Sequence, residues 1–370
     1  MKGDRKMKVL ISTGGTGGHI YPALSLAKYL KEDDNDCEIL FVGTSNHMEA
    51  QIIQEAKYDF IGIAAAGLIG SPWKKLMALK TTFFSIFACR KIIDNFKPDI
   101  VLTFGGYVTV PVGIAAHWRK VPLLVHEQNS FLGKANRTLM KYARNVVVCY
   151  ENVLEQVTEN KGLNFGNPRA TEAADLVVKQ GLLQNLNLSV KKKTVLIVMG
   201  SQGSETINQI ILNTLPKLVN KSYQIIFVTG KKHYEEIAAQ AIVSDNIRVV
   251  DYIDQMAYLK VVDLIIARGG ATTAAEIAVS SVPSIIIPSP YVPNNHQYLN
   301  ALELETLGAT RIIEEVNLSE SVLMAAIDSI INFPENHIKM KKATVGFAKP
   351  NAAHDFIRLI KEVVNGKSSV

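Results

Sequence analysis

The chain has 370 residues, 48% of them hydrophobic and 20% charged, with a net charge of +6 at pH 7. This length predicts two or three domains with large buried cores, and the composition excludes a disordered or fibrous chain. The basic balance is compatible with nucleic acid, anionic lipid or phosphorylated ligands. Nucleic acid is disfavoured because the sequence has no long basic run and no aromatic RNA-binding signature.

No export signal or membrane span is evident. The first apolar stretch, residues 9–12, has four residues, which suits a buried strand better than a signal-peptide core. No run reaches the roughly 18 apolar residues that cross a bilayer. Three cysteines without a C-x-x-C motif favour a reducing compartment. We therefore expect a cytosolic protein that can still touch a membrane.

The first half of the chain alternates short apolar runs with helical patterns, including helices at residues 23–30 and 73–96. This alternation indicates βαβ units and a parallel sheet. The predicted strands are residues 9–12, 39–42, 100–104, 123–126 and 146–149.

A break at residues 166–168 precedes a second series of the same kind, and a last helix is expected at 351–365. We predict an α/β fold of two Rossmann-like, doubly wound parallel-sheet domains facing a cleft. The domains are placed at residues 1–167 and 168–349, with residues 350–370 packing back on the first. The second set of predicted strands is residues 195–199, 225–229, 247–250, 264–267 and 284–288.

The segment GGTGGH, residues 14–19, follows the first strand and should open a helix. Glycines there permit close approach of a ligand, and a helix N-terminus suits phosphate or a developing negative charge. The pattern is neither G-x-G-x-x-G nor a P-loop, so dinucleotide and NTPase functions lose their main support. An imidazole such as His19 is a natural base near pH 7, although a helix-capping role is the alternative.

Two further strand ends carry polar or glycine-rich segments. FGGYVTVP, with Gly105, Gly106 and Tyr107, offers amides for a second phosphate-bearing partner, or is a simple turn. In HEQNS, residues 126–130, an imidazole, a carboxylate and an amide gather where a cleft should lie. Glu127 is placed to orient a base or to be one, and Asn129 to donate to a sugar hydroxyl. The alternative is a hydrogen-bonded structural cluster.

The segment ARGGATTAAEIA, residues 267–278, is a strand, a glycine turn and a helix. The helix dipole with Thr272 and Thr273 suits a diphosphate, and Glu276 can accept two ribose hydroxyls, or else form a surface salt bridge. Gln297 and Asn300 lie one helical turn apart, so both could face a sugar. The scattered histidines give no i, i+4 pair, so we expect neither a metal site nor a cofactor.

Residues 73–91 form a helix with apolar side chains on one arc and basic side chains around it. The arc is suited to insertion at an anionic membrane surface, although a core-facing helix is the alternative. The predicted membrane patch consists of Leu76, Leu79, Phe83, Phe87 and Trp118.

Taken together and in this order, GGTGGH, GGYVTVP, HEQN, GNPR, GSQG and ARGGATTAAE make the chain resemble one family over nearly its whole length. It is the family of UDP-N-acetylglucosamine–N-acetylmuramyl-(pentapeptide) pyrophosphoryl-undecaprenol N-acetylglucosamine transferases of bacterial peptidoglycan synthesis. The resemblance implies a GT-B fold and transfer of N-acetylglucosamine from UDP-N-acetylglucosamine to the 4-hydroxyl of lipid I, with inversion and without an essential metal. It also implies a peripheral protein on the cytoplasmic face of the cell membrane, with wall-synthesis or division proteins as candidate partners.

The resemblance also assigns roles to individual residues. His19 would take the acceptor proton, with Glu127 orienting it or acting as the base, and Glu276 would bind the ribose. His296 and Met199 depart from residues common in the family, and the first departure bears on Gln297. The implied substrate-binding residues are Thr16, Gly17, Gly18, Asn129, Arg169, Ser201, Ile253, Ala271, Thr272, Thr273, Glu276 and Gln297.

Two alternatives remain open from the sequence. One is another GT-B enzyme, such as a UDP-sugar:diacylglycerol glycosyltransferase, which also combines a glycine turn with a membrane-facing helix. The other is a non-catalytic protein that binds the UDP-sugar without turning it over. Acceptor assays separate these hypotheses.

Overall fold

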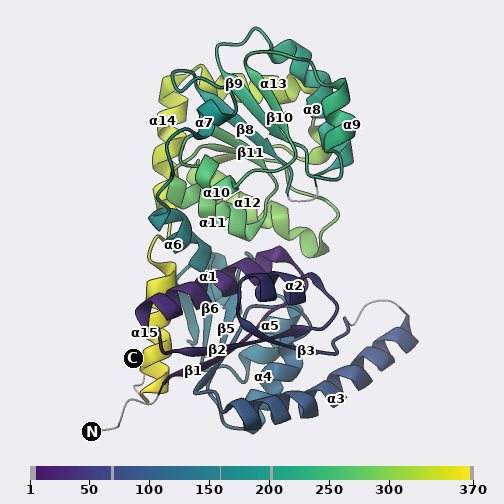
Figure 1. The fold of residues 1–370 in the computed structure, drawn as a ribbon, viewed down its shortest axis with the longest axis vertical. Helices are drawn as coiled ribbons and strands as arrows, with labels where there is room; N and C mark the ends of the chain where they lie inside the picture. Colours follow the sequence, from purple (N-terminus) through teal and green to yellow (C-terminus); the bar gives the residue numbers. More distant parts are fainter. Residues whose placement is uncertain (1–5, 68–70, 159, 201–202, 367–370) are drawn as a thin grey trace. The chain divides into compact units, whose positions relative to one another are not determined.

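The computed structural model describes residues 6–67, 71–158, 160–200 and 203–366. The chain forms two compact units, the first made of Met1–Thr171 and Asn351–Val370 and the second of Glu172–Pro350. Figure 1 shows that each unit is a sheet flanked by helices.

The first unit contains a seven-stranded parallel sheet in the order β3-β2-β1-β4-β5-β6-β7. The chain builds outward from β1 in one direction and from β4 in the other, so the topological switch point lies between these two strands. Ligands of open parallel sheets bind beyond the carboxyl ends of the strands at such a point. The strands are β1 (Lys8–Ser12), β2 (Glu38–Thr44), β3 (Asp59–Ile63), β4 (Ile100–Thr103), β5 (Leu123–Glu127), β6 (Asn145–Val148) and β7 (Gly162–Asn164).

The core of the first unit joins segments from both ends of the chain. Phe356 and Ile360 of the last helix are buried with Ile20 and Leu26 of the first helix and with the central strands. The helices are α1 (Gly17–Asp33), α2 (Met48–Glu55), α3 (Pro72–Phe96), α4 (Thr109–Trp118), α5 (Lys134–Met140), η1 (Glu151–Gln156), α6 (Pro168–Asp175), which leads into the second unit, and α15 (Ala352–Val364).

The second unit contains a six-stranded parallel sheet in the order β10-β9-β8-β11-β12-β13, so its switch point lies between β8 and β11. The strands are β8 (Thr194–Val198), β9 (Gln224–Val228), β10 (Ile247–Val250), β11 (Leu264–Ala267), β12 (Ser284–Ile286) and β13 (Thr310–Ile312). The helices are α7 (Leu182–Asn185), α8 (Glu205–Leu218), α9 (Tyr234–Gln240), α10 (Gln255–Tyr258), α11 (Ala271–Ser280), η2 (Pro293–Asn295), α12 (His296–Leu307), η3 (Glu315–Asn317), α13 (Glu320–Ile331), α14 (Pro334–Ala343) and η4 (Thr344–Gly346).

The predicted fold class is confirmed, because both units are doubly wound parallel sheets. Each strand predicted from an apolar run is present, with its ends within two residues of the prediction. Three short strands, β3, β7 and β13, were not predicted, and each lies at the edge of its sheet.

Candidate active site

The first glycine turn lies at the switch point of the first sheet, directly after β1. Helix α1 begins at Gly17, and Thr16 precedes it with extended backbone. Gly15 has a φ of +92°, a conformation that side chains with a Cβ rarely adopt. The turn therefore brings a helix N-terminus to the carboxyl edge of the sheet, as the glycine pattern predicts.

The His19 ring is held in one tautomer by this turn. Its Nδ1 lies 2.9 Å from the backbone carbonyl oxygen of Gly14. Because a carbonyl oxygen only accepts hydrogen bonds, Nδ1 carries the proton of the neutral ring, and Nε2 carries the lone pair. A partly exposed imidazole with an unprotonated Nε2 at a strand end is suited to accept a proton from a hydroxyl group.

The second glycine turn, after β4, packs against the first. A Cβ built on Gly106 would lie 2.4 Å from the Gly14 carbonyl oxygen, and one on Gly105 would lie 3.0 Å from Nε2 of His19. Both glycines have φ near +90°. Glycine at these two positions therefore lets the turns meet and leaves space beside the histidine. Tyr107 follows them and is 41% exposed.

Glu127 ends β5, and its carboxylate holds the loop that follows. It accepts hydrogen bonds from the backbone N–H groups of Asn129 at 3.0 Å and Gly133 at 2.8 Å, and from Nδ2 of Asn136 at 2.8 Å. The group that fixes the His19 tautomer is the Gly14 carbonyl. The structure thus corrects one of the two predicted roles of Glu127, that of orienting His19.

His126 does not join the site, in contrast to the expectation from HEQNS. Its ring is fully buried, Nε2 donates to the Gly166 carbonyl oxygen at 3.1 Å, and Nδ1 accepts from Nε2 of Gln128 at 2.9 Å. It lies against the rings of Phe104 and Phe356. Burial lowers the pKa of His126 from 6.5 to about 4, so the ring stays neutral and serves the core.

Glu49 supports the first glycine turn through hydrogen bonds, and no motif in the sequence predicted this role. It is fully buried, and its carboxylate accepts from the backbone N–H groups of Thr44 at 3.1 Å and Gly15 at 3.4 Å. A Cβ on Gly14 would lie 2.5 Å from its Oε1. A buried carboxylate therefore fixes the turn that carries His19.

A cavity of about 490 Å³ lies at the switch point of the second sheet. It is lined by residues that follow β8, including Gly200 and Gly203, and by residues that follow β11, including Gly270. Gly270 is the N-cap of α11 and offers no side chain, so the first backbone N–H groups of the helix have no capping side chain. This arrangement suits a diphosphate.

Two of the predicted donor-binding residues, Thr273 and Gln297, line this cavity. Gln255, which was not predicted, also lines it, and its Nε2 donates to Oε2 of Glu276 at 2.9 Å. Glu276 is buried on α11, and Gln297 Oε1 accepts from the backbone N–H of Ser289 at 2.9 Å. The cavity thus joins a helix N-terminus and amide side chains, and one of these amides, that of Gln255, is hydrogen-bonded to the carboxylate of Glu276.

The remaining predicted residues have different surroundings. Asn300 is fully buried and donates to the Gly269 carbonyl oxygen at 3.0 Å, so the expectation that it faces a sugar is wrong. Arg169 belongs to the first unit, where its guanidinium lies 5.6 Å from the ring centre of Tyr21. Ile253 is partly buried and packs against the hydrophobic cluster of the second unit that contains Leu196 and Ile265. Ser201 lies outside the described residues.

An ion pair that the sequence did not predict also lines the cavity at the switch point of the second sheet. Arg268 follows β11, and its Nη1 lies 2.7 Å from Oε2 of Glu315. Its Nη2 donates to Oγ of Ser204 at 2.9 Å. Ser204 is the N-cap of α8, so the arginine ties the two glycine turns of this unit together.

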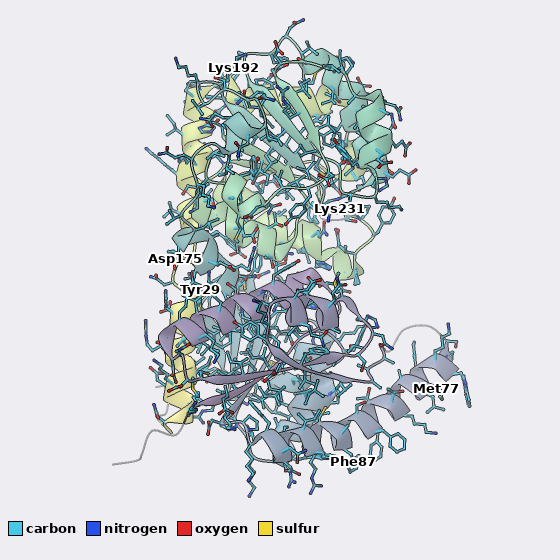
Figure 2. The ribbon with its side chains drawn as sticks, viewed as in Figure 1. Tyr29, Met77, Phe87, Asp175, Lys192 and Lys231 are labelled. Carbon is cyan, nitrogen blue, oxygen red and sulfur yellow. The ribbon has the colours of Figure 1, made fainter. Side chains whose placement is uncertain are left out.

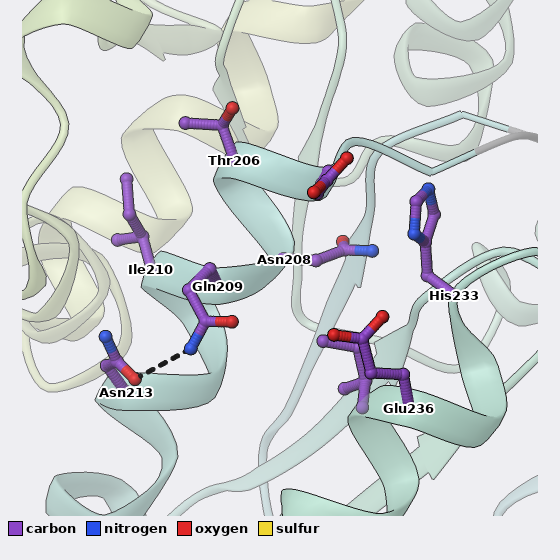
Figure 3. A pocket seen from close by; sticks show the side chains of 9 residues that line it. Thr206, Asn208, Gln209, Ile210, Asn213, His233 and Glu236 are labelled. Atoms are coloured by element: carbon purple, nitrogen blue, oxygen red, sulfur yellow. Dashed lines mark hydrogen bonds between the residues drawn. The ribbon is translucent and has the colours of Figure 1, made fainter.

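A second cavity of this unit, about 440 Å³, lies between α8 and α9 (Figure 3). Its lining includes the carboxylates of Glu205 and Glu236, and Figure 3 shows Asn208 between the two helices. Asn208 donates to the Thr229 carbonyl oxygen at 2.9 Å, which anchors α8 to the end of β9. Both of these carboxylates would repel a diphosphate, whereas the carboxylate of Glu315 at the switch-point cavity is paired with Arg268.

Helix α3 exposes several large apolar side chains. Phe83 and Phe87 are 54% and 46% exposed, Phe83 contacts Phe84 and Phe87, and Phe87 contacts Trp118 of α4. Figure 2 shows Met77 and Phe87 on this helix. The alternative that the arc packs in the core is therefore wrong. The exposed apolar residues are Trp73, Leu76, Met77, Leu79, Phe83, Phe84, Phe87 and Trp118, here called the α3 surface.

Two features are absent from the described residues. Among them, no helix combines the length and the apolar character that crossing a bilayer takes. Within the same part of the chain, no three His, Cys, Asp or Glu side chains are grouped as metal ligands.

Comparisons with known proteins match the chain over most of its length. Residues 9–148 match the glycosyltransferase family 28 N-terminal domain, and residues 194–356 match the family 28 C-terminal domain. The UDP-N-acetylglucosamine–N-acetylmuramyl-(pentapeptide) pyrophosphoryl-undecaprenol N-acetylglucosamine transferase of Pediococcus pentosaceus is 38% identical over 362 residues, which cover 96% of this chain and 99% of that protein. The transferase of the same name from Listeria monocytogenes is 39% identical over 365 residues, covering 97% of this chain and 100% of that protein.

A solved structure agrees with these relatives. The crystal structure of Acinetobacter baumannii MurG superposes with a TM-score of 0.77 at 27% identity, covering 97% of this chain and 100% of that chain. The chain therefore belongs to glycosyltransferase family 28 and, within it, to the family of UDP-N-acetylglucosamine–N-acetylmuramyl-(pentapeptide) pyrophosphoryl-undecaprenol N-acetylglucosamine transferases.

Proposed function

We propose that this chain transfers N-acetylglucosamine from UDP-N-acetylglucosamine to the 4-hydroxyl of the muramyl sugar of lipid I, giving lipid II for peptidoglycan synthesis. The observation that carries this proposal is the near full-length identity of 38 to 39% with transferases of that name. The strand-end cavity with its uncapped helix N-terminus supports the donor half of the reaction.

The donor is held at the switch point of the second sheet. The N–H groups at the start of α11, with Thr272 and Thr273, bind the diphosphate, and Glu276 binds the ribose hydroxyls. Ala271, at the start of the same helix, also contacts the diphosphate and ribose, and Gln297 contacts the transferred sugar. The further predicted contacts are Thr16, Gly17, Gly18, Asn129, Arg169, Ser201 and Ile253. The support is the position of α11 at the cavity and the buried, hydrogen-bonded carboxylate of Glu276.

His19 acts as the base in a direct displacement. Its Nε2 takes the proton of the acceptor hydroxyl as the 4-oxygen forms a bond to the anomeric carbon of the donor sugar. The bond from that carbon to the diphosphate oxygen breaks on the opposite face and UDP leaves. The configuration at the anomeric carbon is thereby inverted. Fixed N–H dipoles at α11 stabilise the negative charge that develops on the leaving group. The turn of Gly105, Gly106 and Tyr107 lies beside the base, on the acceptor side of this reaction.

The enzyme reaches lipid I as a peripheral protein on the cytoplasmic face of the membrane, with the α3 surface inserted among the headgroups. Exposed aromatic and aliphatic side chains of this kind bind the interface, and Lys74, Lys75 and Lys80 on the same helix attract anionic lipid. Proteins of wall synthesis or division are candidate partners at this membrane.

Vesicle binding tests the membrane step. The double variant Phe83→Ser, Phe87→Ser should sediment with anionic vesicles at least roughly tenfold more weakly than the parent, because burial of each ring contributes about 1.5 to 3 kcal/mol. Val243→Ser, which changes an exposed residue of the second unit, is the control. Equal, negligible sedimentation of the parent with anionic and neutral vesicles would refute the membrane role.

The transfer itself is tested with radiolabelled UDP-N-acetylglucosamine and two acceptors, lipid I and diacylglycerol, with EDTA present. We expect label to appear in the lipid I product alone. Label in diacylglycerol would favour the other GT-B enzyme, and nucleotide binding without transfer to either acceptor would favour a non-catalytic protein.

A further inference from the structure

The Arg268–Glu315 pair places two opposite charges in the wall of the donor cavity, which substrate binding alone does not require. We propose that Glu315 sets the rate of UDP release by neutralising Arg268 at the wall of the cavity. The inference rests on the proposed function, because it concerns the same donor site.

The guanidinium of Arg268 is fixed by acceptors from three segments. Nη1 donates to Oε2 of Glu315 at 2.7 Å and to the Ile287 carbonyl oxygen at 3.2 Å. Nη2 donates to Oγ of Ser204 at 2.9 Å. The arginine and glutamate side chains are only 13% and 10% exposed, and both residues line the cavity. The pair is therefore a largely desolvated charge pair within reach of a bound ligand.

Glu315 arrives from a different part of the fold. It begins η3, just after the edge strand β13, whereas Arg268 follows the central strand β11. A carboxylate in the wall of a diphosphate site repels the ligand unless a cation compensates it. The geometry supplies that cation from the neighbouring strand end, so the two residues add little net charge to the cavity.

The difference in charge between the donor and the product explains why this compensation of charge matters for the reaction. The sugar nucleotide is a diester of diphosphate with about two negative charges, whereas the terminal phosphate of free UDP loses a further proton near pH 6. An uncompensated guanidinium favours the more highly charged product over the donor, which slows product release. Paired with Glu315, Arg268 can still position Ser204 and the glycine turn while the neutral N–H groups of α11 act on the leaving group.

The test compares three variants of the full chain. Glu315→Gln removes the charge but keeps an acceptor for Nη1, and Glu315→Asp keeps the charge on a shorter side chain. Glu314→Gln removes one charge from the exposed neighbouring residue and serves as the matched control. The readouts are the Kd values of UDP and UDP-N-acetylglucosamine by calorimetry, product inhibition by UDP, and kcat.

For Glu315→Gln we expect roughly five- to tenfold tighter binding of UDP, a smaller gain for UDP-N-acetylglucosamine and a lower kcat, as one unbalanced charge beside the site produces. Glu315→Asp and Glu314→Gln should stay within about twofold of the parent. Unchanged or weaker UDP binding by Glu315→Gln would overturn the inference, as would equal losses in the Gln and Asp variants, which indicate a structural role. A parent protein that binds no UDP-sugar would instead overturn the proposed function and this inference with it.

Discussion

The His19 ring donates its Nδ1 proton to the carbonyl oxygen of Gly14 at 2.9 Å, so a turn of backbone sets the tautomer of the candidate base. Many active-site histidines are oriented by a carboxylate, whereas the carboxylate of Glu127 is engaged with its own loop. The glycine turn, and not a carboxylate, therefore orients the ring of the proposed base.

The first prediction separates the role of His19 as a base from its hydrogen bond to the Gly14 carbonyl oxygen. His19→Asn keeps a side-chain donor for the Gly14 carbonyl but lacks an imidazole, whereas His19→Ala lacks both. Both variants should lose about 10²- to 10⁴-fold in transfer rate, the usual contribution of a general base, while their affinity for UDP stays unchanged. Initial-rate assays and UDP titration check this. A variant that retains most of its turnover would remove His19 from the mechanism.

The second prediction concerns the contact between the two glycine turns. Gly106→Ala places a Cβ 2.4 Å from the Gly14 carbonyl oxygen, and the residue has a φ of +89°. We expect a loss of roughly 2 to 4 kcal/mol in the free energy of unfolding, with a lower transfer rate. Gly15→Ala is the matched control, because Gly15 has a φ of +92° and no atom within 4 Å of a Cβ. It should cost only about 1 to 2 kcal/mol. Equal losses in urea unfolding would argue against close packing of the turns.

The third prediction is a pH dependence of stability. The pKa of His126 is about 4 in the folded chain because burial disfavours the charged ring, and the ordinary value is 6.5. The unfolded chain therefore binds more protons between about pH 4 and 6.5. The stabilisation is complete above pH 6.5 and is lost as the pH falls, by up to about 1.4 kcal/mol per pH unit.

His126→Gln isolates this contribution, because an amide can still donate to the Gly166 carbonyl oxygen but does not titrate. Urea unfolding at pH 7, 6 and 5 should show a shallower pH slope for the variant than for the parent. Parallel slopes would mean that His126 is protonated in the folded state, or that other groups dominate this range.

The fourth prediction distinguishes the two cavities of the second unit. Glu276→Gln should weaken UDP binding by roughly tenfold or more, because hydrogen bonds to a charged acceptor contribute about 1.5 to 3 kcal/mol. It should also reduce the preference for UDP over 2′-deoxy-UDP. Glu236→Gln, in the cavity between α8 and α9, should leave both affinities unchanged. The opposite pattern would place the nucleotide in the second cavity.

The strands that could not be predicted from the sequence all lie at the edges of the sheets. Buried central strands are continuous apolar runs, so β1 and β8 were readily predicted. The three edge strands that were not predicted are poorly buried or short: β3 and β7 are largely unburied, and β7 and β13 have three residues each. The edge strand β10 was predicted because its sequence, IRVV, is apolar enough.

The candidate site was predictable to a similar degree. Glycine turns at strand ends were visible as motifs, because positive φ and close packing demand glycine. Their partners were not, since Glu49, Gln255 and Glu315 are ordinary polar residues that tertiary folding brings to the turns. Burial could not be inferred either, and this is why His126 and Asn300 were expected at the site and lie in the core.

The most direct test of the account is UDP release from UDP-N-acetylglucosamine by the purified chain, with EDTA present, as a function of added lipid I. The account predicts one UDP released for each disaccharide-lipid formed, and no release above background without acceptor. UDP release that does not require lipid I, or no release when lipid I is saturating, would contradict it.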